Sequence, residues 1–171
     1  MLVLVTGGAR SGKSSFARER LERQPGRLLF VATAEPRDAE MEQRVERHRQ
    51  ERGGHWLTLE EPLALADKLP AAARGVGGVL VDCITLWLSN LYFAHHQQPE
   101  PVLAEVDRLI SCCRAIAQPV YLVTNELGCG VVPDNRLARE FRDLAGFANQ
   151  RLAAAADHAF LLAAGLPLQL K

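Results

Sequence analysis

The chain has 171 residues, of which 48% are apolar, so it is long enough to bury one full hydrophobic core. Its 20 Lys and Arg residues balance its 20 Asp and Glu residues, and this neutrality argues against nucleic acid or a membrane surface as a partner. No apolar stretch approaches the about 20 residues that a transmembrane helix needs. We therefore expect a single cytoplasmic domain with no nucleic-acid partner and no transmembrane segment.

The first predicted element is an apolar strand at residues 2–6, which leads through a glycine-rich turn into a helix predicted over 14–22. The turn matches G-x-x-x-x-G-K-[ST], the phosphate-binding loop. Gly7, Gly8 and Gly12 allow backbone N–H groups to converge on phosphate oxygens. Lys13 supplies a cation for the outer phosphates, and the Ser14 hydroxyl is a natural Mg²⁺ ligand. The alternative is an ordinary strand–turn–helix corner, but the strand before and the helix after favour binding of a nucleotide triphosphate.

Strands and helices alternate through the rest of the chain. We predict strands at 27–33, 55–60, 79–82, 120–124, 158–164 and 166–170, of which 55–60 and 166–170 lie at the edges of the sheet. We predict helices at 38–52, 61–69 (with Pro62 in its first turn), 84–93, 101–117 and 134–156, and a loop at 71–78. This order predicts a doubly wound, mostly parallel α/β sheet with flanking helices, resembling the P-loop NTPases.

Ligands of such sheets bind at the carboxyl ends of the strands, so functional residues should gather near Thr6, Thr33, Asp82 and Asn125. Asp82 follows an apolar strand, where a phosphate-loop protein needs a second carboxylate for Mg²⁺. A lone acidic residue after a strand is a weak signal by itself. The phosphate-binding loop strengthens it, because an unpaired carboxylate would otherwise lie near negative phosphates.

A histidine candidate lies on the helix predicted over 38–52. Arg44, His48 and Arg52 recur every four residues and share one helical stripe. The two arginines disfavour the charged imidazolium and keep the ring neutral, which is the form that can attack phosphorus. The alternative is a histidine that only lies on the helix surface. The remaining histidines lack such neighbours: His55, His95, His96 and His158.

Two other groups of residues allow more than one interpretation. Asn125 and Glu126 begin a glycine-rich loop after a predicted strand, and the next helix carries a broad charged face made of Arg136, Arg139, Arg142 and Asp143. That face is either solvated, with internal ion pairs, or meets a large or anionic substrate. The four cysteines lack the spacing of a zinc site or a disulfide framework. We expect reduced, buried thiols at Cys83, Cys112, Cys113 and Cys129.

Taken together, these motifs resemble a known family, the bifunctional adenosylcobinamide kinases/adenosylcobinamide-phosphate guanylyltransferases of cobalamin biosynthesis. The resemblance covers nearly the whole chain. It rests on residues 5–14, 31–34, Arg44-Val45 with His48, Trp56-x-Thr58-x-Glu60, residues 81–87, Asn125-Glu126 with Gly128, residues 130–133, and Arg139-x-Phe141-Arg142-Asp143-x-x-Gly146-x-x-Asn149-Gln150. Some relatives carry adjacent histidines at the motif of His48, whereas Arg47 precedes it here.

The resemblance implies a P-loop α/β fold, commonly a homotrimer, that catalyses two steps. ATP or GTP phosphorylates adenosylcobinamide, and a histidine then takes GMP from GTP and passes it to adenosylcobinamide phosphate. His48 matches the guanylylated histidine, Lys13 is the second catalytic candidate, and Ser14 and Asp82 would hold Mg²⁺. The family's nucleotide-binding positions correspond to Gly7, Gly8, Ala9, Arg10, Ser11, Gly12, Lys13, Ser14, Ala32, Thr33, Ala34, Arg49, Gln50, Glu51, Arg52, Glu60 and Asp82.

Two other functions remain open at the level of the sequence. One is a simple P-loop small-molecule kinase in which His48 is only structural. The other is a GTP-dependent switch that binds a partner protein. A switch should carry a guanine-reading signal such as N-K-x-D, which Asn125-Glu126 does not fit.

Overall fold

The computed structural model describes residues 1–34 and 53–171, and within them it has one seven-stranded sheet of order β3-β2-β4-β5-β1-β6-β7. All neighbouring strands are parallel except β7, which runs antiparallel to β6. The strands are β1 Leu2–Gly7, β2 Leu28–Ala32, β3 Trp56–Glu60, β4 Gly78–Asp82, β5 Val120–Val123, β6 His158–Ala163 and β7 Leu166–Gln169. The predicted mostly parallel α/β fold is confirmed, with β3 and β7 at the edges.

The described helices are α1 Lys13–Leu21, α3 Leu65–Ala72, α4 Ile84–Ala94, α5 Pro99–Ala115 and α6 Arg136–Ala155. Four of them agree with the predicted ranges to within about two residues, the usual uncertainty of helix ends. The helix predicted over 38–52 lies outside the described residues. Among the described residues, no helix is both long enough and apolar enough to cross a bilayer.

The predicted start of α3 was wrong. The carboxylate of Glu61 accepts hydrogen bonds from the backbone N–H groups of Leu63 (3.0 Å) and Ala64 (2.8 Å). This side-chain bonding stabilises a turn at Glu61–Ala64 and competes with helix formation there. The helix therefore begins at Leu65, and it extends past Pro70 to Ala72, into the segment predicted as a loop.

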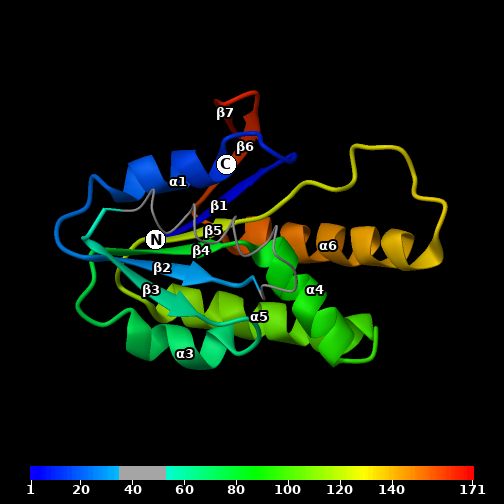
Figure 1. Ribbon diagram of the computed structural model, residues 1–171, viewed down its shortest axis with the longest axis horizontal. Helices are drawn as coiled ribbons and strands as arrows, with labels where there is room; N and C mark the ends of the chain where they lie inside the picture. The colour runs from blue at the N-terminus through cyan, green and yellow to red at the C-terminus, as the bar shows by residue number, and fades with distance from the viewer. Residues whose placement is uncertain (35–52) are drawn as a thin grey trace.

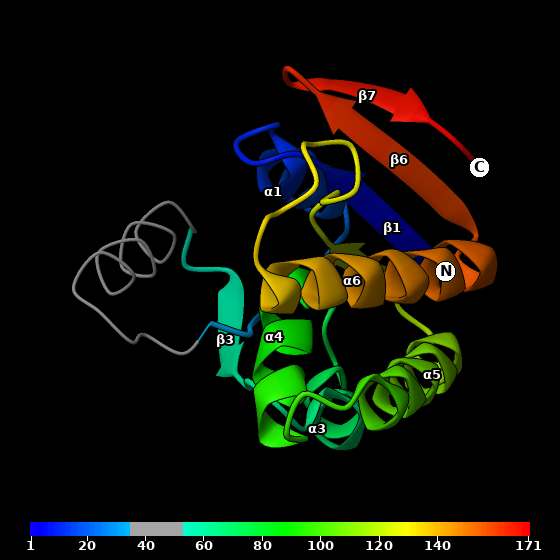
Figure 2. The same ribbon diagram turned by 90° about the vertical axis from the view of Figure 1, so that its right-hand side faces the viewer.

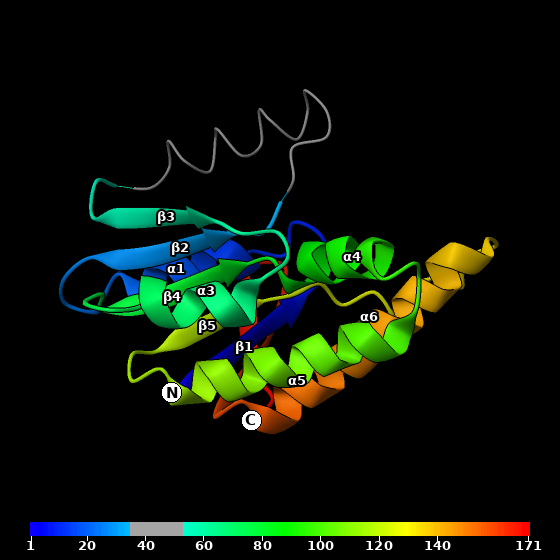
Figure 3. The same cartoon turned by 90° about the horizontal axis from the view of Figure 1, so that it is seen from below.

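Helices cover both faces of the sheet. On one face α1 buries Ala17 and Leu21 together with Val3 and Val5 of β1. On the other face α3, α4, α5 and α6 pack over alternate strand residues such as Leu4. Figures 2 and 3 show these four helices on the side of the sheet away from α1. The continuous burial of β1, β2, β4 and β5 follows from this two-sided cover.

The parallel register brings the predicted functional positions to one edge of the sheet. Ala32 pairs with Glu60 on one side and with Asp82 on the other, and Asp82 pairs with Val123. Val123 in turn pairs with Val5 in β1, just before the phosphate-binding loop. The carboxyl ends of these strands point the same way in Figure 1.

The prediction of four buried thiols was only partly right. The four cysteines are free, and Cys83 and Cys113 are buried, but Cys112 is half-buried and Cys129 is exposed. Cys129 lies in the glycine-rich loop between β5 and α6, outside both layers of helices, so no helix covers it.

Candidate active site

The phosphate-binding loop closes around the side chain of Lys13. The Lys13 ammonium group donates a hydrogen bond to the carbonyl oxygen of Gly8 (2.6 Å) and lies 3.5 Å from the Ser11 hydroxyl. Lys13 is only 8% exposed. Gly12, at φ 94°, ends the loop, and α1 begins at Lys13 with its N–H groups directed at the same space. The loop thus gathers a cation and helix N–H groups as phosphate binding requires.

Two glycines of the loop are required by the packing around them. A Cβ atom at Gly7, which has a φ of 151°, would lie 2.4 Å from the Leu162 carbonyl oxygen and 2.7 Å from the Ser11 hydroxyl oxygen. A Cβ atom at Gly12 would lie 3.2 Å from the Cα atom of Gly165. The contact at Gly7 is closer than real Cβ atoms show, so a side chain there requires the loop or β6 to move. The contact at Gly12 is tighter than most Cβ contacts and requires a smaller shift of its neighbour.

The β6–β7 hairpin supports the loop from the side. Its two-residue turn is formed by Ala164 (φ 50°) and Gly165 (φ 82°), the positive angles typical of a tight hairpin. The N–H group of Gly165 donates a hydrogen bond to the carbonyl oxygen of Ser11 (3.0 Å). We did not predict this contact from the sequence, although an alanine–glycine pair between two strands is a hairpin signal.

Asp82 and Lys13 act on the same buried group. Burial and the negative charge of Asp82 together raise the pKa of the Cys83 thiol to about 11, against the positive charge of Lys13, which lowers it. Only β5 separates the strand of Asp82 from that of the phosphate-binding loop, a distance of about 10 Å. The predicted carboxylate and the predicted cation therefore lie within electrostatic reach of each other.

The donor set of this region fits Mg²⁺. In residues 1–34 and 53–171, no three His, Cys, Asp or Glu side chains gather closely enough to hold a metal ion by themselves. Mg²⁺ does not need such a cage, because it binds one or two protein oxygens, phosphate oxygens and water. The Ser14 hydroxyl in the first turn of α1 and the Asp82 carboxylate at the end of β4 would supply the protein oxygens.

The segment after β2 is held against the end of β4. The Thr33 hydroxyl donates a hydrogen bond to the Cys83 carbonyl oxygen (2.7 Å) and accepts one from the Cys83 N–H group (2.9 Å). The Asn90 amide of α4 donates to the Thr33 carbonyl oxygen (2.9 Å). Ala32, Thr33 and Ala34 therefore lie beside Asp82, as predicted. Glu60 lies at the same level on the edge strand and is exposed.

A buried polar network holds the end of β5. The Thr124 hydroxyl donates to the side-chain oxygen of Asn149 (2.8 Å), whose amide nitrogen donates to the Asn125 carbonyl oxygen (3.0 Å). The Thr85 hydroxyl accepts from the Asn125 N–H group (2.7 Å) and lies 3.3 Å from the Thr124 hydroxyl. We missed Thr85 and Thr124 as site residues, because isolated threonines carry no sequence signal.

The predicted histidine stripe cannot be placed. Arg44, His48 and Arg52 lie outside the described residues, as do Arg49, Gln50 and Glu51. The structure therefore brings together the phosphate-binding loop, residues 32–34, Glu60 and Asp82, while the histidine remains a prediction from the sequence.

Comparison with known families decides which kind of P-loop protein this is. Residues 3–170 match the CobU family, described as cobinamide kinase / cobinamide phosphate guanyltransferase. The chain belongs to this family. It is 41% identical over 182 residues to the bifunctional adenosylcobalamin biosynthesis protein CobU of Escherichia coli (strain K12), with 100% of each chain covered. It is 43% identical to the protein CobP of the same description from Pseudomonas aeruginosa, covering 98% of this chain and 96% of that one.

Solved structures support the fold. The RadB recombinase aligns with 94% of this chain and 73% of its own at a TM-score of 0.56 and 15% identity. An ATPase of a bacterial type III secretion system aligns with 98% of this chain and 56% of its own at a TM-score of 0.58 and 12% identity. At such low identity these likenesses establish the fold class, and the family match carries the functional argument.

Proposed function

We propose that the protein is a bifunctional transferase of cobalamin biosynthesis that phosphorylates adenosylcobinamide and then attaches GMP to the product. The observation that carries this proposal is a phosphate-binding loop closed around Lys13, in a chain that matches the cobinamide kinase / cobinamide phosphate guanyltransferase family over residues 3–170. The relatives are named bifunctional adenosylcobalamin biosynthesis proteins.

In the first step, the acceptor hydroxyl oxygen attacks the γ-phosphorus of ATP or GTP. The bond between that phosphorus and the β–γ bridging oxygen breaks, the nucleoside diphosphate leaves, and the hydroxyl proton passes to solvent. Phosphoryl transfer depends mainly on positioning and charge neutralisation. Lys13 and the N–H groups of Gly7–Ser14 provide both, with the further nucleotide contacts made by Ala32–Ala34, Glu60 and Asp82.

In the second step, the neutral His48 ring attacks the α-phosphorus of GTP and releases pyrophosphate. A phosphate oxygen of adenosylcobinamide phosphate then attacks the same phosphorus, the phosphorus–nitrogen bond breaks, and adenosylcobinamide-GDP is formed. His48 regains its neutral state. Arg49, Gln50, Glu51 and Arg52 complete the nucleotide-binding set by their match to the family.

Mg²⁺, held by Ser14 and Asp82, would neutralise part of the triphosphate charge when bound. The protein residues keep the triphosphate aligned through the loop. We further propose a cytoplasmic homotrimer, on the basis of the family resemblance. Sedimentation equilibrium tests the trimer directly, and a monomeric mass at micromolar concentration would contradict it.

Labelling with α-³²P-GTP tests the histidine assignment. The wild-type protein should take up acid-labile, base-stable label and release pyrophosphate, and His48→Ala should take up none while keeping cobinamide phosphorylation. His96→Ala is the matched control, because His96 is an exposed histidine far from the phosphate-binding loop in sequence. Label on His48→Ala would overturn the assignment and favour a simple P-loop kinase. Tight GDP retention with slow, cobinamide-independent hydrolysis would favour a GTP-dependent switch.

A further inference from the structure

The loop between β5 and α6, residues 124–135, is held in place at both ends. Near its start the Glu126 N–H group donates to the Gly7 carbonyl oxygen (3.0 Å), which ties it to the phosphate-binding loop. Near its end the Arg139 guanidinium donates to the carbonyl oxygens of Pro133 (3.0 Å) and Asp134 (2.7 Å). Figure 1 shows the loop in yellow, arching over the start of α6. Its position is therefore defined relative to the phosphate-binding loop.

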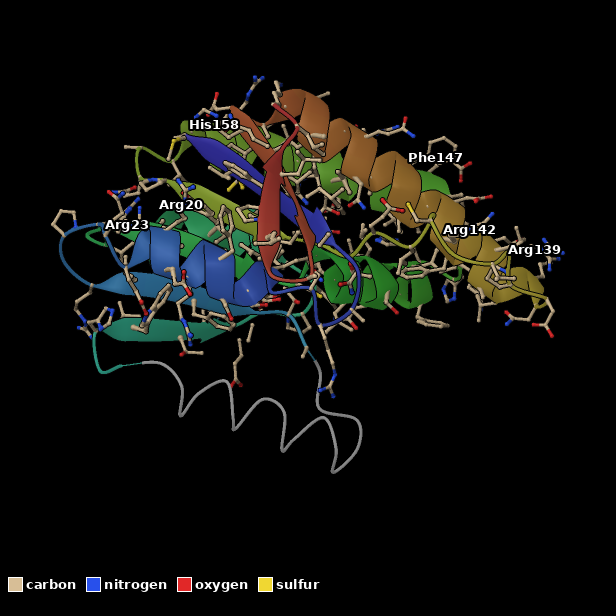
Figure 4. All side chains as sticks on the ribbon, turned by 90° about the horizontal axis from the view of Figure 1, so that it is seen from above. Arg20, Arg23, Arg139, Arg142, Phe147 and His158 are labelled. Atoms are coloured by element: carbon tan, nitrogen blue, oxygen red, sulfur yellow. The ribbon has the colours of Figure 1, made fainter. Side chains whose placement is uncertain are left out.

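One face of helix α6 contacts the start of this loop and extends outward from it. Asn149 on that face bonds to Asn125, beside the phosphate-binding loop. Arg142 lies seven residues earlier, almost two full turns, so it shares the face at a point about 10 Å further out. Figure 4 labels Arg139 and Arg142 on α6 beside the loop. Phe147 lies on another face of the helix and lines a separate cavity between α4 and α6.

Gly146 occupies the same face, one turn from Arg142 and one turn from Asn149. A glycine inside a helix costs ~0.5–1 kcal/mol relative to alanine. No described atom lies within 4 Å of the place that a Cβ atom would occupy, so packing within the described chain does not require glycine here. A bare stretch of helix backbone is useful where another molecule lies against it.

Arg142 supplies a cation one turn from Gly146, and the loop before α6 carries exposed apolar side chains. The Arg142 guanidinium lies 3.5 Å from the carboxylate of the neighbouring Asp143. The Arg142 side chain is 22% exposed and that of Asp143 is 62% exposed, so solvent weakens this ion pair from the Asp143 side. Val131 and Val132 in the loop are 96% and 60% exposed. Exposed apolar side chains grouped at a functional site typically mark a binding surface.

We infer that this surface, formed by Arg142 and Gly146 of α6 with Val131 and Val132 of the loop, binds the corrinoid acceptor. The inference rests on the proposed function and names its acceptor site. Arg142 binds the phosphate group of the acceptor, because a guanidinium forms strong, directional hydrogen bonds to phosphate. Gly146 leaves room for the arm that carries this phosphate, and the two valines contact the apolar edge of the ring. The tie between Glu126 and Gly7 keeps the acceptor close to the transferred group.

Steady-state kinetics with cobinamide and cobinamide phosphate as separate acceptors test the inference. Arg142→Gln should raise the KM for cobinamide phosphate by about tenfold to a hundredfold, with a smaller change for unphosphorylated cobinamide. Gly146→Leu should raise the KM for both acceptors and leave the KM for GTP within about twofold. Arg136→Gln, which removes an exposed α6 arginine paired with Glu140, is the control and should change neither.

The activity of the wild-type protein distinguishes a failure of this inference from a failure of the proposed function. If the wild-type protein fails to guanylylate itself or to use either acceptor, the proposed function is wrong. If it does both, and Gly146→Leu and Arg142→Gln keep the wild-type KM for both acceptors, the acceptor site is elsewhere. A Gly146→Leu protein that loses its subunit association but keeps its acceptor KM would show that this face is a contact between copies of the chain. Circular dichroism checks folding, and Gly146→Ala provides a second, conservative variant.

Discussion

Gly7 and Gly8 are adjacent in the phosphate-binding loop, yet the structure predicts opposite responses to a single added methyl group. At Gly7 the methyl group would lie 2.4 Å from the Leu162 carbonyl oxygen, in a backbone region that side chains disfavour. At Gly8 no atom lies within 4 Å of the added group. Gly7→Ala and Gly8→Ala are therefore a matched pair that differs in backbone conformation and local packing.

The expected cost at Gly7 has two sources. A non-glycine residue held at such a φ angle costs ~1–3 kcal/mol, and forcing extra volume into packed structure costs a further ~1–3 kcal/mol. The loop and β6 can share the displacement, so we expect a total near 3 kcal/mol, which lowers the Tm of a chain of this size by about 10 °C. Gly8→Ala should change the free energy of unfolding by no more than about 0.5 kcal/mol.

Thermal and urea unfolding without nucleotide measure the difference, with circular dichroism as the probe. The same displacement moves Ser11, so Gly7→Ala should also weaken GTP binding by about tenfold in calorimetric titration. Equal Tm values for the two variants would refute the packing argument. So would a Gly7→Ala protein within about 2 °C of the wild type.

Three other outcomes are expected. Lys13→Ala should lower the rate of both steps by about a hundredfold or more in separate kinase and guanylylation assays, and kinase activity at the wild-type rate would contradict a shared loop. Asn149→Ala should destabilise the fold by ~1–3 kcal/mol in urea unfolding, because Thr124 and Asn125 each lose a hydrogen-bonding partner. An unchanged urea midpoint would show that this network does not contribute to stability. Burial and Asp82 raise the pKa of Cys83 from 9.0 to about 11, so the folded state keeps the thiol neutral while the unfolded chain ionises it. The contribution of this thiol to the free energy of unfolding should be fully present below pH 9 and should fall by up to ~3 kcal/mol as the pH rises towards 11. Cys83→Ala should lose less stability than the wild type over that range.

Local signals predicted the parts of the site that are continuous in sequence. The strand before Gly7 and the helix from Lys13 follow from a short apolar run and a glycine-rich turn, and the structure contains both. The register of the parallel strands then brings Asp82 level with Ala32, as the expected sheet required. Residue type and immediate neighbours were sufficient for the strand and the helix, and the position of Asp82 needed only the expected parallel sheet in addition.

Contacts between distant segments could not be predicted in this way. The bond from Gly165 to Ser11 depends on β6 lying next to β1, and the alternation of strands and helices does not give the strand order. Thr124 is fully buried and bonded to Asn149, but a threonine after a strand is equally compatible with solvent. The start of α3 was misplaced because a proline signal was considered without the competing carboxylate of Glu61.

The position of β1 between β5 and β6 in the sheet has a consequence for synthesis on the ribosome. Its neighbours β5 and β6 begin 118 and 156 residues later in the chain, at Val120 and His158. The nucleotide-binding loop, although translated before these strands, therefore cannot reach its final shape until residues near Gly165 have emerged to bond with Ser11. A nascent chain stalled before that point should fail to retain GTP, so the nucleotide site forms only after β6 and the β6–β7 turn have been made.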